Sequence, residues 1–134
     1  MNNYRNYFGF KKEPFSNDIE EKDLLKLPCM LSVKERLSYV SNLGGVFVLT
    51  GDVGSGKSTA IRYAVSCFHP SSVKIAQVIA TSGSVIDFYR QVAQSLNLDV
   101  KTASKPFLVK SIRMSILEIV LSKKQTLILT VDEA

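Results

Sequence analysis

The chain has 134 residues, with 17 Lys and Arg against 12 Asp and Glu, and a formal net charge of +5. With 46% apolar and 22% charged residues it has the composition of a folded globular domain, which excludes wholesale disorder, a collagen-like chain and a coiled coil. No apolar run approaches the roughly 18 residues of a membrane-spanning helix, and the N-terminus lacks the apolar core of a secretory signal. Cys29 and Cys67 have no metal-ligand spacing, so we expect ordinary, partly buried thiols in a cytoplasmic protein.

Residues 1–31 combine aromatic, charged and proline positions without a period. They predict an extended lead-in segment whose aromatic side chains pack on the body of the protein. From Ser32, an expected N-cap with Glu35 three residues later, the pattern becomes helical, and Gly44 ends this helix. We therefore expect a lead-in over residues 1–31 and a core over residues 32–134.

Short apolar runs then alternate with helical patterns. Residues 46–50 (VFVLT) are continuous and β-branched, which is typical of a strand buried on both faces. Further strands are predicted over residues 73–80 and 127–131. Strands that alternate with helices favour βαβ crossovers and a mostly parallel sheet, an α/β fold. The three helices between them are predicted by apolar residues at helical spacing: Ile61, Ala64, Val65 and Phe68; Val85, Tyr89, Val92 and Leu96; Leu108, Ile112, Ile116 and Ile119.

The stretch GDVGSGKS at residues 51–58 matches the phosphate-loop pattern G-x-x-x-x-G-K-[ST], between a predicted strand and a predicted helix. Glycines let successive N–H groups point at an anion, and the helix start adds free N–H groups and a positive dipole end. Lys57 is expected to reach the β- and γ-phosphates and Ser58 to ligate Mg²⁺. A chance match is expected in well under about one such chain in a hundred. The expected nucleotide contacts are Gly51, Asp52, Val53, Gly54, Ser55, Gly56, Lys57, Ser58 and Thr59.

The predicted strand at residues 127–131 ends in two acids, Asp132 and Glu133. The carboxyl ends of parallel strands face the crevice in which ligands bind. We expect Asp132 to hold Mg²⁺ through water and Glu133 to orient and deprotonate an attacking water, with Lys57 as the other catalytic residue. Acids at a strand end often only begin a turn, and it is the upstream phosphate loop that makes this pair specific. An acid pair favours ATP hydrolysis over GTP switching.

The region from residue 60 to residue 125 carries nine basic residues against three acids. A surface that faces DNA or RNA would explain this excess, and so would lysines scattered over solvated helix faces, and the sequence leaves the two readings open. The basic residues are Arg62, Lys74, Arg90, Lys101, Lys105, Lys110, Arg113, Lys123 and Lys124, and the acids are Asp87, Asp99 and Glu118.

With both motifs, the chain resembles the N-terminal part of an AAA+ ATPase of the ExeA/GspA type, a P-loop NTPase. The resemblance spans essentially the whole chain. It rests on YFGFKKEPFS at residues 7–16, on the phosphate loop (Walker A) at residues 51–59, and on VDEA (Walker B) at residues 131–134. It implies an AAA+ parallel sheet with flanking helices. It also places the opening aromatic residues near the adenine: Tyr7, Phe8, Phe10, Pro14 and Phe15.

This family has two main settings. Helper ATPases of transposable elements, similar to the IstB and TniB proteins, bind DNA and direct a transposase to its target. GspA-type proteins, known as general secretion pathway protein A, help to assemble the type II secretion channel. Residues 17–28 resemble the transposon-linked branch more. The resemblance therefore implies ATP and Mg²⁺ as ligands, DNA and a transposase as partners, and a homo-oligomer for the full-length parent, with the secretion role as the alternative.

The chain departs from this family because it ends at the Walker B acids, before the sensor strand, the arginine finger and the helical lid. In the AAA+ strand order 5-1-4-3-2, the strand between the phosphate-loop strand and the Walker B strand comes later in sequence. We therefore expect an incomplete sheet with unpaired strand edges and exposed apolar faces. Such a product is expected to bind nucleotide, or to assemble with intact subunits, with little or no hydrolysis, while the parent hydrolyses ATP.

Overall fold

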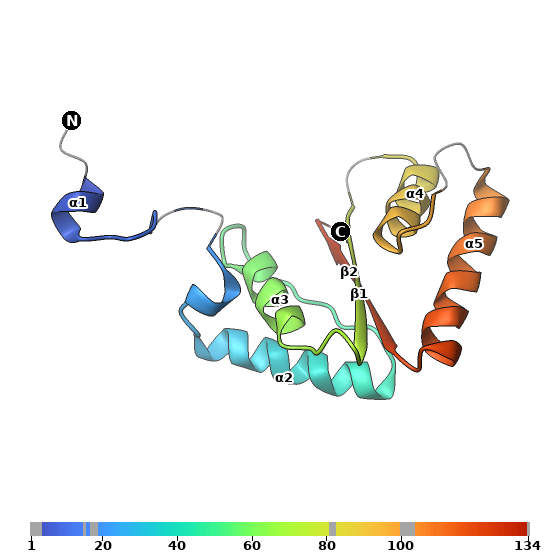
Figure 1. Cartoon of the computed structure of the whole chain (residues 1–134), viewed down its shortest axis with the longest axis horizontal. Helices are drawn as coiled ribbons and strands as arrows, with labels where there is room; N and C mark the ends of the chain where they lie inside the picture. Colours follow the sequence, from blue (N-terminus) through green and yellow to red (C-terminus); the bar gives the residue numbers. More distant parts are fainter. Residues whose placement is uncertain (1–3, 15, 17–18, 81–82, 100–103, 134) are drawn as a thin grey trace.

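The computed structural model describes residues 4–14, 16, 19–80, 83–99 and 104–133. Helices lie on both sides of a strand pair, and a short helix lies apart at the N-terminal end (Figure 1). No helix within these residues is long and apolar enough to cross a membrane. The elements are α1 (Tyr4–Phe8), η1 (Glu21–Asp23), α2 (Pro28–Leu43), α3 (Lys57–Ser66), β1 (Val73–Ile79), α4 (Val85–Ser95), α5 (Lys105–Leu117), η2 (Glu118–Ser122) and β2 (Thr126–Asp132).

The strands β1 and β2 pair in parallel, from Val73 opposite Thr126 to Ile79 opposite Asp132. The ladder continues past the strand end, since the Ala80 N–H donates to the carbonyl of Asp132 at 2.8 Å. A parallel pair needs a crossover connection, and α4 and α5 supply it. The predicted α/β fold, with a parallel sheet and flanking helices, is confirmed.

The prediction of a strand at residues 46–50 is wrong. The segment is extended but pairs with no strand, and its side chains alternate in exposure: Val46 is 89% and Val48 72% exposed, whereas Phe47 and Leu49 are half-buried. An extended segment becomes a strand only where a neighbour takes up its N–H and C=O groups. In the part of the chain that the structure describes, β1 and β2 pair only with each other. The expectation of unpaired edges and exposed apolar side chains therefore agrees with the structure.

Apolar side chains form two clusters, one on each side of the strands. Successive residues of β1 point to opposite faces, so Ala76 and Val78 enter the cluster under α4 and α5, while Ile75 packs on the cluster under α2 and α3. Most positions predicted from helical spacing are buried there. Ile61, Phe68, Tyr89 and Ile116 are half-buried, and Val85, which begins α4, is exposed. The buried members predicted in advance are Ala64, Val65, Val92, Leu96, Leu108, Ile112 and Ile119.

The helix α2 begins at Pro28, with Leu27 as its N-cap, so the prediction of Ser32 as the cap is wrong. Proline suits the first turn because its φ is already helical and it has no N–H to satisfy there. The predicted end is confirmed, since Gly44 has a φ of 72° and donates its N–H to the carbonyl of Val40 at 2.9 Å. The division into residues 1–31 and 32–134 stays a prediction.

Three aromatic residues of the lead-in, Tyr7, Phe8 and Phe10, contact one another, and none of them belongs to either apolar cluster. The ring centroids of Tyr7 and Phe8 are 4.9 Å apart and those of Phe8 and Phe10 5.8 Å apart, and Tyr7 is 83% exposed. The expectation that these side chains pack on the core is wrong for these three residues, and Phe15 lies outside the described residues. The segment satisfies polar groups within itself, for example through the Tyr4 hydroxyl, which donates to Glu13. In Figure 1, α1 accordingly lies apart from the other helices.

A capping box starts α4. The Ser84 hydroxyl accepts from the Asp87 N–H at 3.3 Å, and the Asp87 carboxylate accepts from the Ser84 N–H at 3.2 Å. The same carboxylate accepts from the Ser84 hydroxyl at 2.7 Å and from Arg90 at 3.0 Å. The hydrogen bonds from Ser84, with the added contribution of Arg90, hold the pKa of Asp87 below its usual value.

Because folding lowers the pKa of Asp87, its contribution to stability is present above the unfolded-state pKa and is lost as the pH falls through the folded-state pKa. We therefore expect Asp87→Ala to lower Tm by a few degrees at neutral pH, and the difference from wild type to shrink toward acidic pH. Thermal unfolding over a pH series measures this. Asp99→Ala, at an exposed position outside the cap, is the control. A difference that stays constant with pH would contradict the role of the carboxylate.

Candidate functional site

The loop between residues 50 and 57 needs its glycines for two different reasons. Gly54 and Gly56 have φ values of 79° and 82°, a region that L-residues rarely adopt, although a Cβ at either would meet no atom within 4 Å. At Gly51 the limit is space, because a Cβ there would lie 3.1 Å from the Ser55 hydroxyl oxygen. The Ser55 N–H also donates to the carbonyl of Asp52 at 3.2 Å, which closes the turn.

The helix α3 begins directly after this turn with unused N–H groups. Gly56 is its N-cap and provides no side-chain acceptor. The first helical hydrogen bond runs from the Ala60 N–H to the Gly56 carbonyl at 2.8 Å, so the N–H groups of Lys57, Ser58 and Thr59 have no acceptor within the helix. Together with the positive end of the helix dipole, these groups make a site for an anion.

The ammonium group of Lys57 lies folded back across the loop. It donates to the carbonyl of Gly51 at 2.9 Å and to that of Asp52 at 2.7 Å. Both acceptors are neutral, and no carboxylate of the described residues forms an ion pair with Lys57. The Lys57 ammonium therefore makes no ion pair with the Asp52 carboxylate of the same loop, and it lies next to the free N–H groups of α3.

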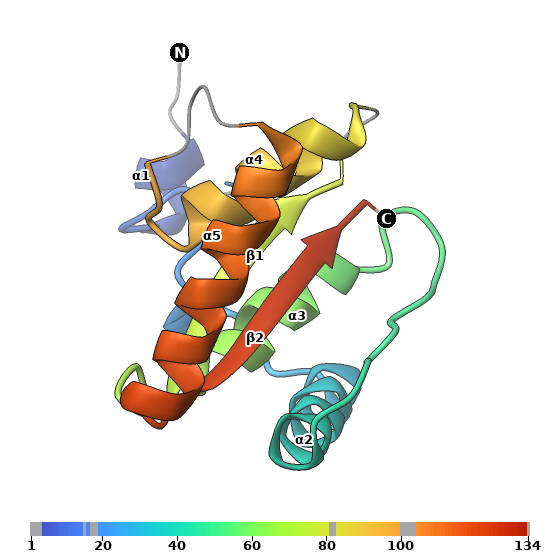
Figure 2. The same cartoon turned by 90° about the vertical axis from the view of Figure 1, so that its right-hand side faces the viewer.

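The two acids predicted to act with the loop stand at the end of β2. Asp132 is the last residue of the strand and is exposed, and its carboxylate accepts from the Glu133 N–H at 3.0 Å. Glu133 is also exposed and has a φ of 57°, which is uncommon for a residue other than glycine. Figures 1 and 2 both show the end of β2 at the same end of the molecule as the turn that precedes α3. Within the described residues, no hydrogen bond or ion pair joins these acids to the loop.

The donors available for a divalent cation are oxygen atoms. The Ser58 hydroxyl and the Asp132 carboxylate are both exposed, and hard oxygen ligands of this kind fit Mg²⁺. No group of three or more His, Cys, Asp or Glu side chains converges on one point in the described ranges. The protein thus offers part of a coordination shell that phosphate oxygens and water can complete, which is the usual manner of binding Mg²⁺.

The lead-in contacts α3 through residues that the sequence analysis did not assign to the site. Arg62 of α3 lies 3.4 Å from the carboxylate of Glu21 and donates to the carbonyl of Ile19 at 3.2 Å. The sequence does contain a signal for this contact, because Arg62 is a basic residue one helical turn after the phosphate loop and the lead-in contains an acidic run. Phe8 and Phe10, predicted near the adenine, are exposed, and Phe15 lies outside the described residues. The helix α1 lies apart from α3 in Figure 1.

The predicted basic excess is partly neutralised within the chain. Arg62 pairs with Glu21, Arg90 with Asp87 and Lys123 with Glu118. Cys29 and Cys67 are free thiols and exposed, so the expectation of partly buried cysteines is wrong.

Comparisons with known proteins place these features in a family. The family described as AAA domain matches residues 41–134, which include the phosphate loop and both acids. The chain is 31% identical over 133 residues to General secretion pathway protein A from Aeromonas hydrophila. The alignment covers 98% of this chain and 24% of that protein, so the chain spans about a quarter of the length of this relative. No solved structure matches. The expected resemblance to AAA ATPases of the ExeA/GspA type is confirmed.

Proposed function

The chain belongs to the AAA domain family, and from this premise we propose that residues 51–59 bind the phosphates of ATP. The observation that carries the proposal is the loop itself, in which two left-handed glycines lead into a helix start with unused N–H groups. Phosphate oxygens are the acceptors that such an array of N–H groups suits. Thermal unfolding with and without Mg-ATP tests this, and the effect of nucleotide has to be lost in Lys57→Ala.

Lys57 has a defined role in this proposal. Its ammonium is held by the carbonyls of Gly51 and Asp52, which are weaker partners than phosphate oxygens. Nucleotide binding exchanges these two hydrogen bonds to neutral carbonyls for hydrogen bonds to the negatively charged β- and γ-phosphates. Holding the cation at the loop keeps it oriented before the nucleotide arrives, so little side-chain entropy is lost on binding.

Ser58 and Asp132 would hold Mg²⁺, and Glu133 would act as the general base for hydrolysis. Mg²⁺ supplies charge neutralisation at the phosphates when it is bound. The Glu133 carboxylate is exposed and unpaired by any cation of the described residues, so it is free to accept a proton from water. The uncommon φ of Glu133 holds its backbone in a conformation that local sequence does not favour. Hydrolysis also requires positive charge beside the transferred phosphate, and Lys57 supplies one such charge.

The similarity to General secretion pathway protein A supports a role as an ATPase that assists assembly of a secretion system. The second candidate is an ATP-dependent helper that acts on DNA together with a transposase. Within the described part of residues 60–125, five basic residues lie outside the internal ion pairs and support this second candidate: Lys74, Lys105, Lys110, Arg113 and Lys124.

The DNA candidate predicts that the affinity for a duplex falls steeply between about 50 and 200 mM salt, because each phosphate contact releases a counterion. Neutralising Lys105 and Lys124 together is expected to reduce the slope of log affinity against log salt by about 2, and to weaken binding equally for all sequences. Fluorescence anisotropy with a labelled duplex measures this, and Lys26→Ala in the lead-in is the control. Retention on DNA that is no greater than on a neutral matrix would remove the DNA candidate and leave the secretion candidate.

A further inference from the structure

One face of α5 and η2 points away from the core and combines apolar with cationic side chains. It consists of Lys110, Arg113, Met114, Leu117 and Leu121, which we call the outer face of α5. Lys110, Met114, Leu117 and Leu121 follow one another at spacings of three or four, and Arg113 lies three residues after Lys110 and four before Leu117, so all five are neighbours on the helix surface. All five are exposed, with Leu121 at 68%. The outer face is therefore an apolar stripe with two cations at its N-terminal end.

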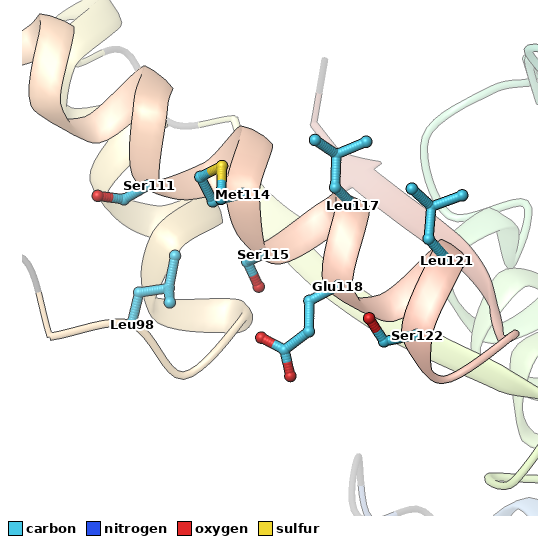
Figure 3. Close-up of a pocket in the computed structure, with 8 residues that line it drawn as sticks. All are labelled: Leu98, Ser111, Met114, Ser115, Leu117, Glu118, Leu121 and Ser122. Atoms are coloured by element: carbon cyan, nitrogen blue, oxygen red, sulfur yellow. The ribbon is translucent and has the colours of Figure 1, made fainter.

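A groove with a volume of about 480 Å³ runs beside this stripe. Leu98, from the segment after α4, lies across from Ser115, and the small side chains of Ser111 and Ser115 keep the helix surface low between them (Figure 3). Leu117 and Leu121 project side by side from the helix (Figure 3). The result is a ridge of leucines next to a shallow trough.

The charges of this region are not balanced within the chain. Glu118, the acid of the groove, forms an ion pair with Lys123 at 3.0 Å. Lys110 and Arg113 form no ion pair with any described residue. The stripe therefore has an uncompensated positive edge, and a complementary surface would be apolar with negative charge at one end.

We propose that the outer face of α5 docks an amphipathic helix of a protein partner that carries acidic residues beside its apolar stripe. The partner's apolar residues would cover Met114, Leu117 and Leu121, and its carboxylates would pair with Lys110 and Arg113. A ridge beside a trough along one helix is the surface onto which a second helix packs. A nucleic acid backbone would satisfy the cations but would leave the three apolar side chains in water.

The test uses two fluorescent peptides of about 18 residues, long enough for five helical turns. Both carry leucines at helical spacing, flanked by glutamates in one and by lysines in the other. We expect the glutamate peptide to bind saturably. The lysine peptide should bind with an affinity at least about tenfold lower. Leu117→Asp is expected to weaken the glutamate peptide about tenfold or more, because it places a charge in the centre of the contact. Tyr39→Asp, at an exposed position of α2, is the matched control and should bind as wild type does.

A charge swap makes the proposal specific. In the double variant Lys110→Glu with Arg113→Glu, the preference should reverse in favour of the lysine peptide. Equal binding of both peptides, or no effect of Leu117→Asp, would overturn the proposal. The proposal would also be overturned if duplex DNA displaced the peptide and the affinity for this DNA were unchanged in Leu117→Asp, since the outer face of α5 would then bind DNA. The rise in Tm caused by Mg-ATP is an independent readout, because these substitutions lie outside the phosphate loop. Each variant must show this rise in Tm as a sign of correct folding.

Discussion

Mg-ATP at about a hundred times its Kd should raise the Tm of the wild-type chain by about 10 °C and leave that of Lys57→Ala almost unchanged. A ligand that binds only the folded state stabilises it by about 2.7 kcal/mol at that concentration, and domains of this size gain several degrees per kcal/mol. Lys57 carries the effect because its ammonium is the positive charge of the loop and is held there by two neutral carbonyls. The measurement is thermal unfolding, followed by circular dichroism, over a series of ATP concentrations.

Lys105→Ala is the matched control, since Lys105 is an exposed lysine at the start of α5. It should show the full effect of nucleotide. Lys57→Ala without nucleotide should unfold close to wild type, because its ammonium contacts only two exposed carbonyls. If Mg-ATP raised the Tm of Lys57→Ala as much as that of Lys105→Ala, ATP would bind at a site other than residues 51–59. The absence of a cooperative transition in the wild type would mean that this chain does not form the site by itself.

Leu108→Ala should destabilise the chain by about 3 kcal/mol, the largest single-residue effect that we expect on folding. Leu108 is 0% exposed and packs with Ala76 and Val78 of β1 and Ala93 of α4. Truncation of the Leu108 side chain loses the free energy of transferring its atoms from water into the core. It also leaves a cavity, because the strand and helices that surround Leu108 can relax only partly. Urea unfolding gives the free-energy change.

Phe107→Ala, at the preceding position of the same helical turn, is the control. Phe107 is a larger side chain but 55% exposed, and its removal should cost less than half as much. A smaller loss for Leu108→Ala than for Phe107→Ala would contradict the packing of α5 described above. A change in the slope of the urea transition, in addition to its midpoint, would indicate that the cluster folds separately from the rest.

Local patterns in the sequence determined most of the elements correctly. The phosphate loop, the helix after it, both strands of the pair and the helices α4 and α5 follow from glycine positions, apolar runs and helical spacing. These signals are reliable because each arises within a few neighbouring residues: Ser84 and Asp87 cap α4, and Gly56 permits the backbone turn that begins α3. The family assignment rests on local motifs of the same kind, at residues 7–16, 51–59 and 131–134.

The tertiary structure alone decided which extended segments became strands and which exposed side chains found a partner. Residues 46–50 have a strand-like sequence, yet they pair with no strand, since a strand depends on hydrogen bonds to a distant neighbour. The aromatic side chains around Tyr7 have the composition of a core but remain exposed, because burial depends on the presence of a complementary surface. In the same way, spacing places Lys110 and Leu117 on one helix, but only the packing of α4 and α5 shows that their face is turned outward, beside a groove. The sequence by itself thus determined the motif and the order of elements, while long-range contacts determined which surfaces are left open to partners.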